Sequence, residues 1–406
     1  MTRIKDRAVR DLRLFMLANV FMGLGACVNS AILNNYLKEG FNLDVAARTF
    51  LEFPRELPGF LASLFLAFLA LMGEVRIAMA ANLLVAAGCL ALGFIPASYP
   101  FLIGALFLYS LGQHLYMPLS SSIGMSFARE GGEGAVLGRI GAVNTAAVLA
   151  GTLVLVAVFQ WIGVSYRAAY TAAAGFYFTS AVAFLLMDPR RGEHRPVRFV
   201  VRREYGRYYL LALIYGARKQ LFITFAPWML VDFFRAPVTT MTFLGFCVAA
   251  LSIGVQPLVG RMTDRFGARA VLAGESMLVV GLCLAYAFVS TLLPAGPAFV
   301  VVAACYVVDQ CASAVTMTRA VYAKSIVRDP RDLAATLTLD VSLDHAVTMF
   351  FPALGGILWR TGGTLGYRYV FLGGALVAAL NFFVTRGIRT TGGSTTTLSG
   401  RIGDGR

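Results

Sequence analysis

The residues of this chain that could do chemistry are ionisable side chains that interrupt long apolar segments. Arg218 and Lys219 stand side by side in IYGARKQLFITFAPW, well inside an apolar run. A charge deep in a membrane segment is costly and marks a substrate or proton pathway. Because adjacent helical residues project about 100° apart, we expect one cation to contact substrate and the other to pair with a carboxylate of a neighbouring helix. The alternative is that both form structural ion pairs between helices.

Carboxylates on two later apolar segments are the expected partners of these cations. Asp309 and Gln310 lie in CYVVDQCASA, where Asp309 is the natural counter-ion and Gln310 a substrate contact. Movement of a nearby cation changes the affinity of a buried carboxylate for a proton, so we expect Asp309 to couple transport to protons. Asp344 and His345, in TLTLDVSLDHAVTMFFP, are further proton-coupling candidates because imidazole titrates near neutral pH. The alternative for this pair is a hydrogen-bonded set that holds two helices together.

A third group of charges lies in TFLEFPRELPGF, early in the second apolar segment. Glu52, Arg55 and Glu56 have i, i+3 and i, i+4 spacing, which allows ion pairs on one helical face. We expect Glu52 and Arg55 to form part of an outer gate and Glu56 to take part in proton coupling. An equally compatible interpretation is an internal ion-pair group that makes membrane insertion less costly.

Polar residues on two other segments complete the expected substrate site. They are His114 and Tyr116 in LGQHLYMPLSSS and Asn34 in NSAILNNYLK. A lone membrane histidine is equally compatible with hydrogen-bonded packing. The sequence has no HExxH, GxSxG or Walker-type motif, and its cysteines form no CxxC, so we expect neither an enzyme nor a cofactor. An Asp-plus-His set could bind a divalent cation, but the nearby Arg218 and Lys219 would repel it, so no metal is expected.

The elements that position these residues are transmembrane helices. Of the 406 residues, 58% are hydrophobic and 14% are charged, whereas a soluble domain has roughly 25% charged residues. The mean hydropathy is +0.72, and continuous apolar runs recur as in helical rather than β-barrel membrane proteins. We therefore predict an all-α membrane protein with twelve spans. They cover about 13–37, 50–72, 76–96, 99–124, 138–161, 167–187, 208–231, 238–259, 270–291, 297–320, 334–358 and 367–386.

The basic residues predict how these spans are oriented. Most of the 35 Lys and Arg fall on the N-terminus and the even-numbered loops, which places both termini in the cytoplasm. The net charge of +14 then reflects topology and contact with lipid headgroups, and no nucleic-acid partner is expected. The basic segment 188–207 separates two six-helix halves, 1–187 and 208–390. The Gly/Ser/Thr-rich tail, 391–406, is expected to be disordered.

The loop between spans eight and nine carries a family resemblance. It reads GRMTDRFGAR and resembles the G-x-x-x-D-R-x-G-x-R signature of the major facilitator superfamily. Gly260 and Gly267 would permit close helix packing and a tight turn. The resemblance implies that Asp264, Arg265 and Arg269 belong to a cytoplasmic latch that holds the outward-facing state. It also implies two pseudo-symmetric halves whose helices 1, 4, 7 and 10 line a central cavity.

The first half departs from this signature. Its equivalent loop, LMGEVRIAMA, keeps only Gly73, Glu74 and Arg76, and the fifth span lacks the Gly-Pro signature of drug/proton antiporters. The resemblance and the intramembrane charges together predict a monomeric secondary active transporter of a bacterial-type inner membrane. It would move a small polar organic anion or zwitterion by proton-coupled symport or antiport. The alternative is proton-driven efflux of drugs or other amphipathic compounds.

Overall fold

The computed structural model describes residues 2–69, 72–96, 98–128, 133–189, 201–328 and 331–388. These residues are almost entirely helical, at 91%, and no strand occurs among them, which confirms the all-α fold class. Most of the basic segment between the expected halves, and the whole tail expected to be disordered, lie outside the described residues.

The chain up to residue 189 forms a group of helices that we call the N-terminal bundle. Its second expected span is broken at Leu51 and Leu61, and Pro58 lies inside the middle piece, where a proline removes a backbone donor. The helices are α1 (Thr2–Phe41), α2 (Val45–Phe50), α3 (Glu52–Phe60), α4 (Ala62–Leu69), α5 (Glu74–Phe94), α6 (Tyr99–Met125), α7 (Glu133–Ala157) with the π-helix η2 (Val158–Ile162), and α8 (Tyr166–Leu185).

The chain from residue 201 onward forms the C-terminal bundle. Its first span changes from α-helix to π-helix after Gln220, one residue beyond Lys219, and again after Trp228. Such π-turns are rare and are frequent at functional sites. The helices are η3 (Arg203–Tyr205), α9 (Gly206–Gln220), η4 (Leu221–Phe225), α10 (Ala226–Trp228), η5 (Met229–Phe233), α11 (Val238–Leu292), α12 (Ala295–Ala312), η6 (Ser313–Val315), α13 (Thr316–Ile326), α14 (Arg331–Thr361), η7 (Gly363–Leu365) and α15 (Gly366–Arg386).

Each of the twelve expected spans coincides with helical segments of the structure. In the described part of the chain, eight helices are long and apolar enough to cross a membrane. Two of the remaining spans, 50–72 and 208–231, consist of shorter consecutive helices, and 99–124 falls on α6, which carries polar residues. Spans 238–259 and 270–291 both lie within α11, which is counted once although its backbone turns at Gly267.

Two glycines make the same turn at equivalent places in the two bundles. Gly267 has φ 79° and ψ 158°, and Gly73, before α5, has φ 77° and ψ 149°. This region of backbone space is open to glycine and strained for other residues. Gly267 therefore makes the tight turn expected of it. The close packing expected at Gly260 is not observed, because a Cβ there would meet only the Met317 Sδ at 3.8 Å, an ordinary contact.

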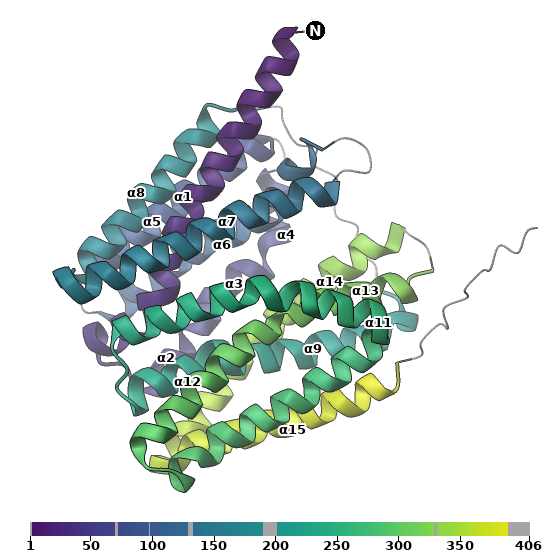
Figure 1. Ribbon diagram of the computed structural model, residues 1–406. Helices are drawn as coiled ribbons and strands as arrows, with labels where there is room; N and C mark the ends of the chain where they lie inside the picture. Colours follow the sequence, from purple (N-terminus) through teal and green to yellow (C-terminus); the bar gives the residue numbers. More distant parts are fainter. Residues whose placement is uncertain are drawn as a thin grey trace, which may run out of the picture.

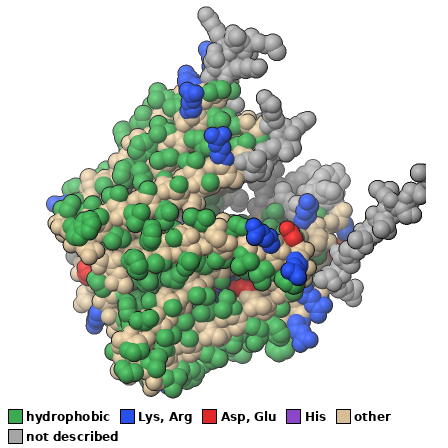
Figure 2. Space-filling view, in the orientation of Figure 1, with side chains coloured by type: hydrophobic (Ala, Val, Ile, Leu, Met, Phe, Trp, Pro, Cys, Tyr) green, Lys and Arg blue, Asp and Glu red, His purple; other side chains and the backbone are tan. Residues whose placement is uncertain are grey.

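The two bundles lie against each other along several helices (Figure 1). Within the N-terminal bundle α1 packs on α7 and α8, and within the C-terminal bundle α15 packs on α9, α11 and α14. Across the junction α14 packs on α2 and α3, and α7 packs on α11. Hydrophobic side chains are spread over the whole face shown in Figure 2. Large apolar side chains with high exposure in the structure include Phe68 at 77% and Leu376 at 73%. A surface this apolar suits lipid contact.

The turn at Gly267 can be tested by substitution. We expect Gly267→Ala to destabilise the protein by about 1–3 kcal/mol, because alanine is strained at this positive φ. Gly274→Ala is the matched control, since it lies on the same helix with nothing within 4 Å of the added Cβ; helix propensity should make it neutral or stabilising by up to about 1 kcal/mol. Thermal unfolding in detergent measures both. Equal effects of the two substitutions would contradict the turn assignment.

Candidate functional site

One end of the junction between the bundles is sealed by polar contacts. At the C-terminal end of α1 the Lys38 Nζ lies 2.5 Å from the Asp232 Oδ1, and the Asn35 Nδ2 donates to the Ala236 carbonyl at 2.9 Å. The Lys38 ammonium also lies 5.7 Å from the ring centroid of Trp228, whose side chain is fully buried. We call this region the sealed end. Its contacts hold α1 against η5.

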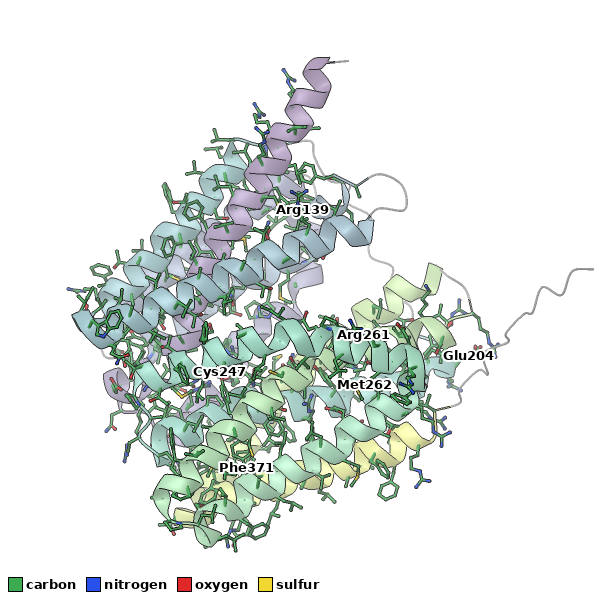
Figure 3. The ribbon with its side chains drawn as sticks, in the orientation of Figure 1. Arg139, Glu204, Cys247, Arg261, Met262 and Phe371 are labelled. Atoms are coloured by element: carbon green, nitrogen blue, oxygen red, sulfur yellow. The ribbon has the colours of Figure 1, made fainter. Side chains whose placement is uncertain are left out.

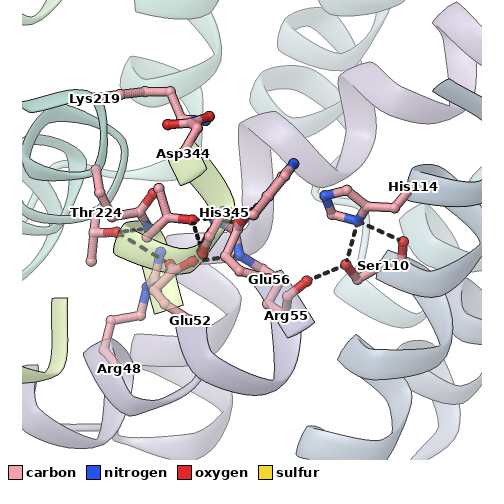
Figure 4. A network of polar contacts seen from close by, with 12 residues as sticks. Arg48, Glu52, Arg55, Glu56, Ser110, His114, Lys219, Thr224, Asp344 and His345 are labelled. Atoms are coloured by element: carbon pink, nitrogen blue, oxygen red, sulfur yellow. Dashed lines mark hydrogen bonds and ion pairs between the residues drawn. The ribbon is translucent and has the colours of Figure 1, made fainter. Parts of the chain in front are cut away.

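A fully buried carboxylate, that of Glu52, joins the two bundles beside the sealed end (Figure 4). The Arg48 Nη1 lies 2.5 Å from the Glu52 Oε1, and the Arg55 Nε donates to the Glu52 Oε2 at 2.6 Å. From the C-terminal bundle, the Thr224 hydroxyl donates to the Glu52 Oε1 at 3.2 Å. A buried charge is tolerated only when it is paired and hydrogen-bonded. Glu52 meets this requirement with groups from α2, α3 and η4.

Glu56, one turn later on α3, makes a second connection between the bundles. The Arg55 Nη2 lies 2.9 Å from the Glu56 Oε1. On the other oxygen, the His345 Nδ1 lies 2.8 Å from the Glu56 Oε2, and the Thr348 hydroxyl donates to it at 3.3 Å. His345 and Thr348 both come from α14. The hydrogen-bonded set between the second and eleventh spans, weighed above as one interpretation of His345, is thus present, while its role in proton coupling stays a prediction.

The two cations of the seventh span both make ion pairs inside the C-terminal bundle. The Arg218 Nη2 lies 2.8 Å from the Asp309 Oδ1, and the Arg218 Nη1 lies 3.1 Å from the Glu275 Oε1. Lys219 pairs with Asp344. Both cations are therefore paired in this conformation, as the alternative interpretation of structural ion pairs requires, and contact of one of them with substrate stays a prediction. Asp309 is the counter-ion that the sequence indicated.

Glu275 is a partner that sequence reasoning missed. It lies on the second part of α11 and is 7% exposed. It stands near one end of the span 270–291, which has no other charged residue. That isolation was the available signal, because a single carboxylate in an apolar helix needs a partner.

A cavity of about 480 Å³, which we call the central cavity, lies between the bundles. It is next to Glu52 and its partners Arg48 and Arg55, which together we call the Glu52 cluster. Asn34 and Gln310, two of the residues expected to contact substrate, line it. Arg218 and Lys219 do not line it. Further lining residues that the sequence analysis did not assign to substrate are Asn29, Arg48, Tyr109, Gln113, Thr152 and Tyr306, together with Arg55, which it assigned to a gate.

A second cavity, of about 520 Å³, is lined by His114 and Tyr116, the other expected substrate contacts. Ala26 and Gln113 line both cavities, so the two spaces adjoin. Asn19 and Met22 of α1 line the second cavity only. The space therefore runs along α1 from the sealed end toward the end at which α1 begins. Figure 3 shows Arg139 near the start of α7 and Arg261 within α11, before the backbone turn at Gly267.

The signature loop lies on the side away from the sealed end. The side chains of Asp264, Arg265 and Arg269 are exposed. In the part of the chain that the structure describes, no ion pair involves these three residues. The expected latch is therefore not engaged in this conformation, and its role stays a prediction.

Comparison with known proteins gives one family and a set of solved structures. Residues 14–204 match the model of the family described as Major Facilitator Superfamily. No curated protein matches the chain.

Three of the similar solved structures cover nearly the whole chain. The nucleoside transporter NupG has a TM-score of 0.73 at 12% identity, covering 93% of this chain and 98% of its own. A bacterial homologue of the human lysosomal transporter Spinster, inward-facing and occupied, has a TM-score of 0.71 at 16% identity, covering 93% and 96%. A POT family transporter in complex with a thioalcohol-conjugated peptide has a TM-score of 0.73 at 10% identity, covering 94% and 97%. At these identities the likeness concerns the fold.

The Glu52 cluster leads to a stability prediction. We expect Glu52→Gln to destabilise the protein by about 3–5 kcal/mol, because it leaves Arg48 and Arg55 without their shared buried partner. Glu204→Gln is the matched control: its ion pair with Arg328 is exposed, at 48% and 81%, so the expected loss is below about 1 kcal/mol. Thermal unfolding in detergent compares the two. Similar losses would mean that the buried cluster contributes no more than a surface pair.

Proposed function

We propose that the chain is a secondary transporter of the major facilitator superfamily, and that it moves a small polar organic anion or zwitterion by alternating access. The two moving units would be the predicted halves, 1–187 and 208–390. The observation that carries the proposal is the central cavity, which adjoins a sealed end on one side and a second cavity on the other.

The chemistry of the central cavity supports the substrate class. Its lining combines two guanidinium groups, those of Arg48 and Arg55, with the amides of Asn34, Gln113 and Gln310. No carboxylate occurs among the described residues that line it. The charge of the two guanidinium groups is balanced by Glu52 and Glu56, so the lining offers an anionic group mainly N–H donors of guanidinium and amide groups, while the amide oxygens can accept from a substrate donor.

The buried charges of the C-terminal bundle support proton coupling. One cation, Arg218, is shared by two buried carboxylates, Asp309 and Glu275. Lys219 and Arg319 each pair with one further carboxylate, Asp344 and Asp340. A buried negative charge in excess is costly, so one proton shared at the Arg218 group would balance it.

The orientation in the membrane completes the proposal. The excess of Lys and Arg on the N-terminus and the even-numbered loops supports a cytoplasmic location for both termini. The cavities then open toward the cytoplasm, as in the inward-facing Spinster homologue that the chain resembles in fold. We propose a monomer in a bacterial-type inner membrane, whose partners are substrate, protons and lipid, in symport or antiport.

A ligand screen followed by transport assays can identify a substrate and test the role of the central cavity. A thermal-shift screen of metabolites and drugs, followed by uptake into proteoliposomes, should identify a small anion or zwitterion. Gln310→Ala and Asn34→Ala should then raise KM about fivefold or more, because each removes a hydrogen bond of about 1 kcal/mol in the cavity. Gln160→Ala, on the exposed part of η2, is the control. Transport of amphipathic cations alone, or an unchanged KM, would contradict the proposed substrate class.

Asp309 provides a separate test of proton coupling. We expect Asp309→Asn to keep substrate exchange but to abolish substrate-dependent proton movement, because the amide cannot take up and release a proton. A pH-sensitive dye inside proteoliposomes measures the proton flux, and labelled substrate measures exchange. Proton movement equal to that of the unaltered protein would rule out Asp309 as the coupling residue.

A further inference from the structure

Two histidines and a glutamate that are far apart in the sequence meet at the junction of the bundles. Glu56 of α3, His114 of α6 and His345 of α14 each offer one ligand atom, and these atoms all lie within 4.8 Å of one another. The imidazoles of His114 and His345 lie edge to face, with ring centroids 4.8 Å apart. Figure 4 shows the two imidazoles close to each other beside Glu56.

The histidine of α6 is held in an orientation that suits a ligand. The His114 Nδ1 lies 2.9 Å from the backbone carbonyl of Ser110 and 2.9 Å from the Ser110 hydroxyl. A metal-binding histidine typically donates its other ring N–H to a carbonyl or carboxylate, which fixes the tautomer. Here a hydrogen on Nδ1 leaves the lone pair of Nε2 free on the side of His345.

A glycine provides the room in which the two rings meet. A Cβ added at Gly59 would lie 2.7 Å from the His114 Nε2 and 2.8 Å from the His345 Cε1. Any larger residue at this position would therefore push both imidazoles away. The approach of the two rings depends on the absence of a side chain here.

The surrounding cations do not prevent a bound ion. Arg55 is paired with Glu52 and with the Oε1 of Glu56, so the Oε2 remains on the side of His345. The repulsion expected from the cations of the seventh span is reduced by their own carboxylates. Arg218 is paired with Asp309 and Glu275, and Lys219 with Asp344.

We propose that Glu56, His114 and His345 bind one transition-metal ion of the Zn²⁺ class and thereby join the two bundles. Two imidazoles and one carboxylate, with a fourth position left for water, are an established ligand set for zinc, and imidazole also suits copper and nickel. Bonds of about 2.0–2.2 Å in a tetrahedron place ligand atoms about 3.4 Å apart, so a small movement of the rings closes the site. Calcium and magnesium are excluded because they take oxygen ligands.

The test is a zinc titration of the full chain, purified without a histidine tag and treated with a chelator. Calorimetry should show saturable binding of one ion per chain, and zinc should raise the melting temperature. His114→Ala and His345→Gln should each weaken binding about tenfold or more; the glutamine keeps a hydrogen-bond donor for Glu56. Gly59→Ala should weaken binding although it removes no ligand.

The chain supplies its own control. It has three histidines, and the third, His194, is not one of the proposed ligands, so His194→Ala should bind zinc as the unaltered protein does. The absence of saturable binding would overturn the proposal. Equal affinity in a folded His114→Ala, His345→Gln double variant would overturn it as well, because the ion would then lie elsewhere. Both outcomes are independent of whether a transport substrate is known.

Discussion

A charge in an apolar layer can persist only where partners surround it, and this constraint governs the position of Glu52. Its side chain is fully buried, on a helix within a predicted span. The break at Leu51 separates α2 from α3, and Arg48 and Arg55 meet the Glu52 carboxylate from the two sides of this break. An unpaired carboxylate here would cost several kcal/mol. Groups from both sides of this break, together with Thr224 of the other bundle, satisfy the carboxylate, so the break at Leu51 and this part of the junction serve the same buried charge.

The polar contacts of the buried charged residues are of two kinds: some cross between the bundles and others lie within one bundle. The contacts of Glu52 with Thr224, and of Glu56 with His345, cross between the bundles. The pairs of Arg218 lie entirely within the C-terminal bundle. A rigid movement of one bundle against the other preserves the second kind and breaks the first. Arg218 and Lys219 of the seventh span therefore connect helices within one bundle. Glu52 and Glu56 of the second span instead connect the two bundles.

The sequence predicted where the helices lie in the chain better than it predicted which side of each helix contacts which neighbour. Long apolar runs locate helices because bilayer thickness fixes their length, and Asp309 could be paired with the seventh span because opposite deep charges need each other. The proximity of Glu56 and His345, which are 289 residues apart in the chain, depends on how α3 and α14 are rotated and packed. Apolar periodicity carries little of that information in a helix that is hydrophobic all round. For the same reason the expected substrate contacts could not be divided between the two cavities in advance.

The sealed end also places one tryptophan where its environment depends on conformation. Trp228 is fully buried, whereas Trp161 is 80% exposed, and the Lys38 ammonium lies over the Trp228 ring. Separation of α1 from η5 would remove this cation and admit water to the indole. The chain has only three tryptophans. The ultraviolet emission of Trp228 would therefore report, without any attached label, whether the sealed end is open or closed.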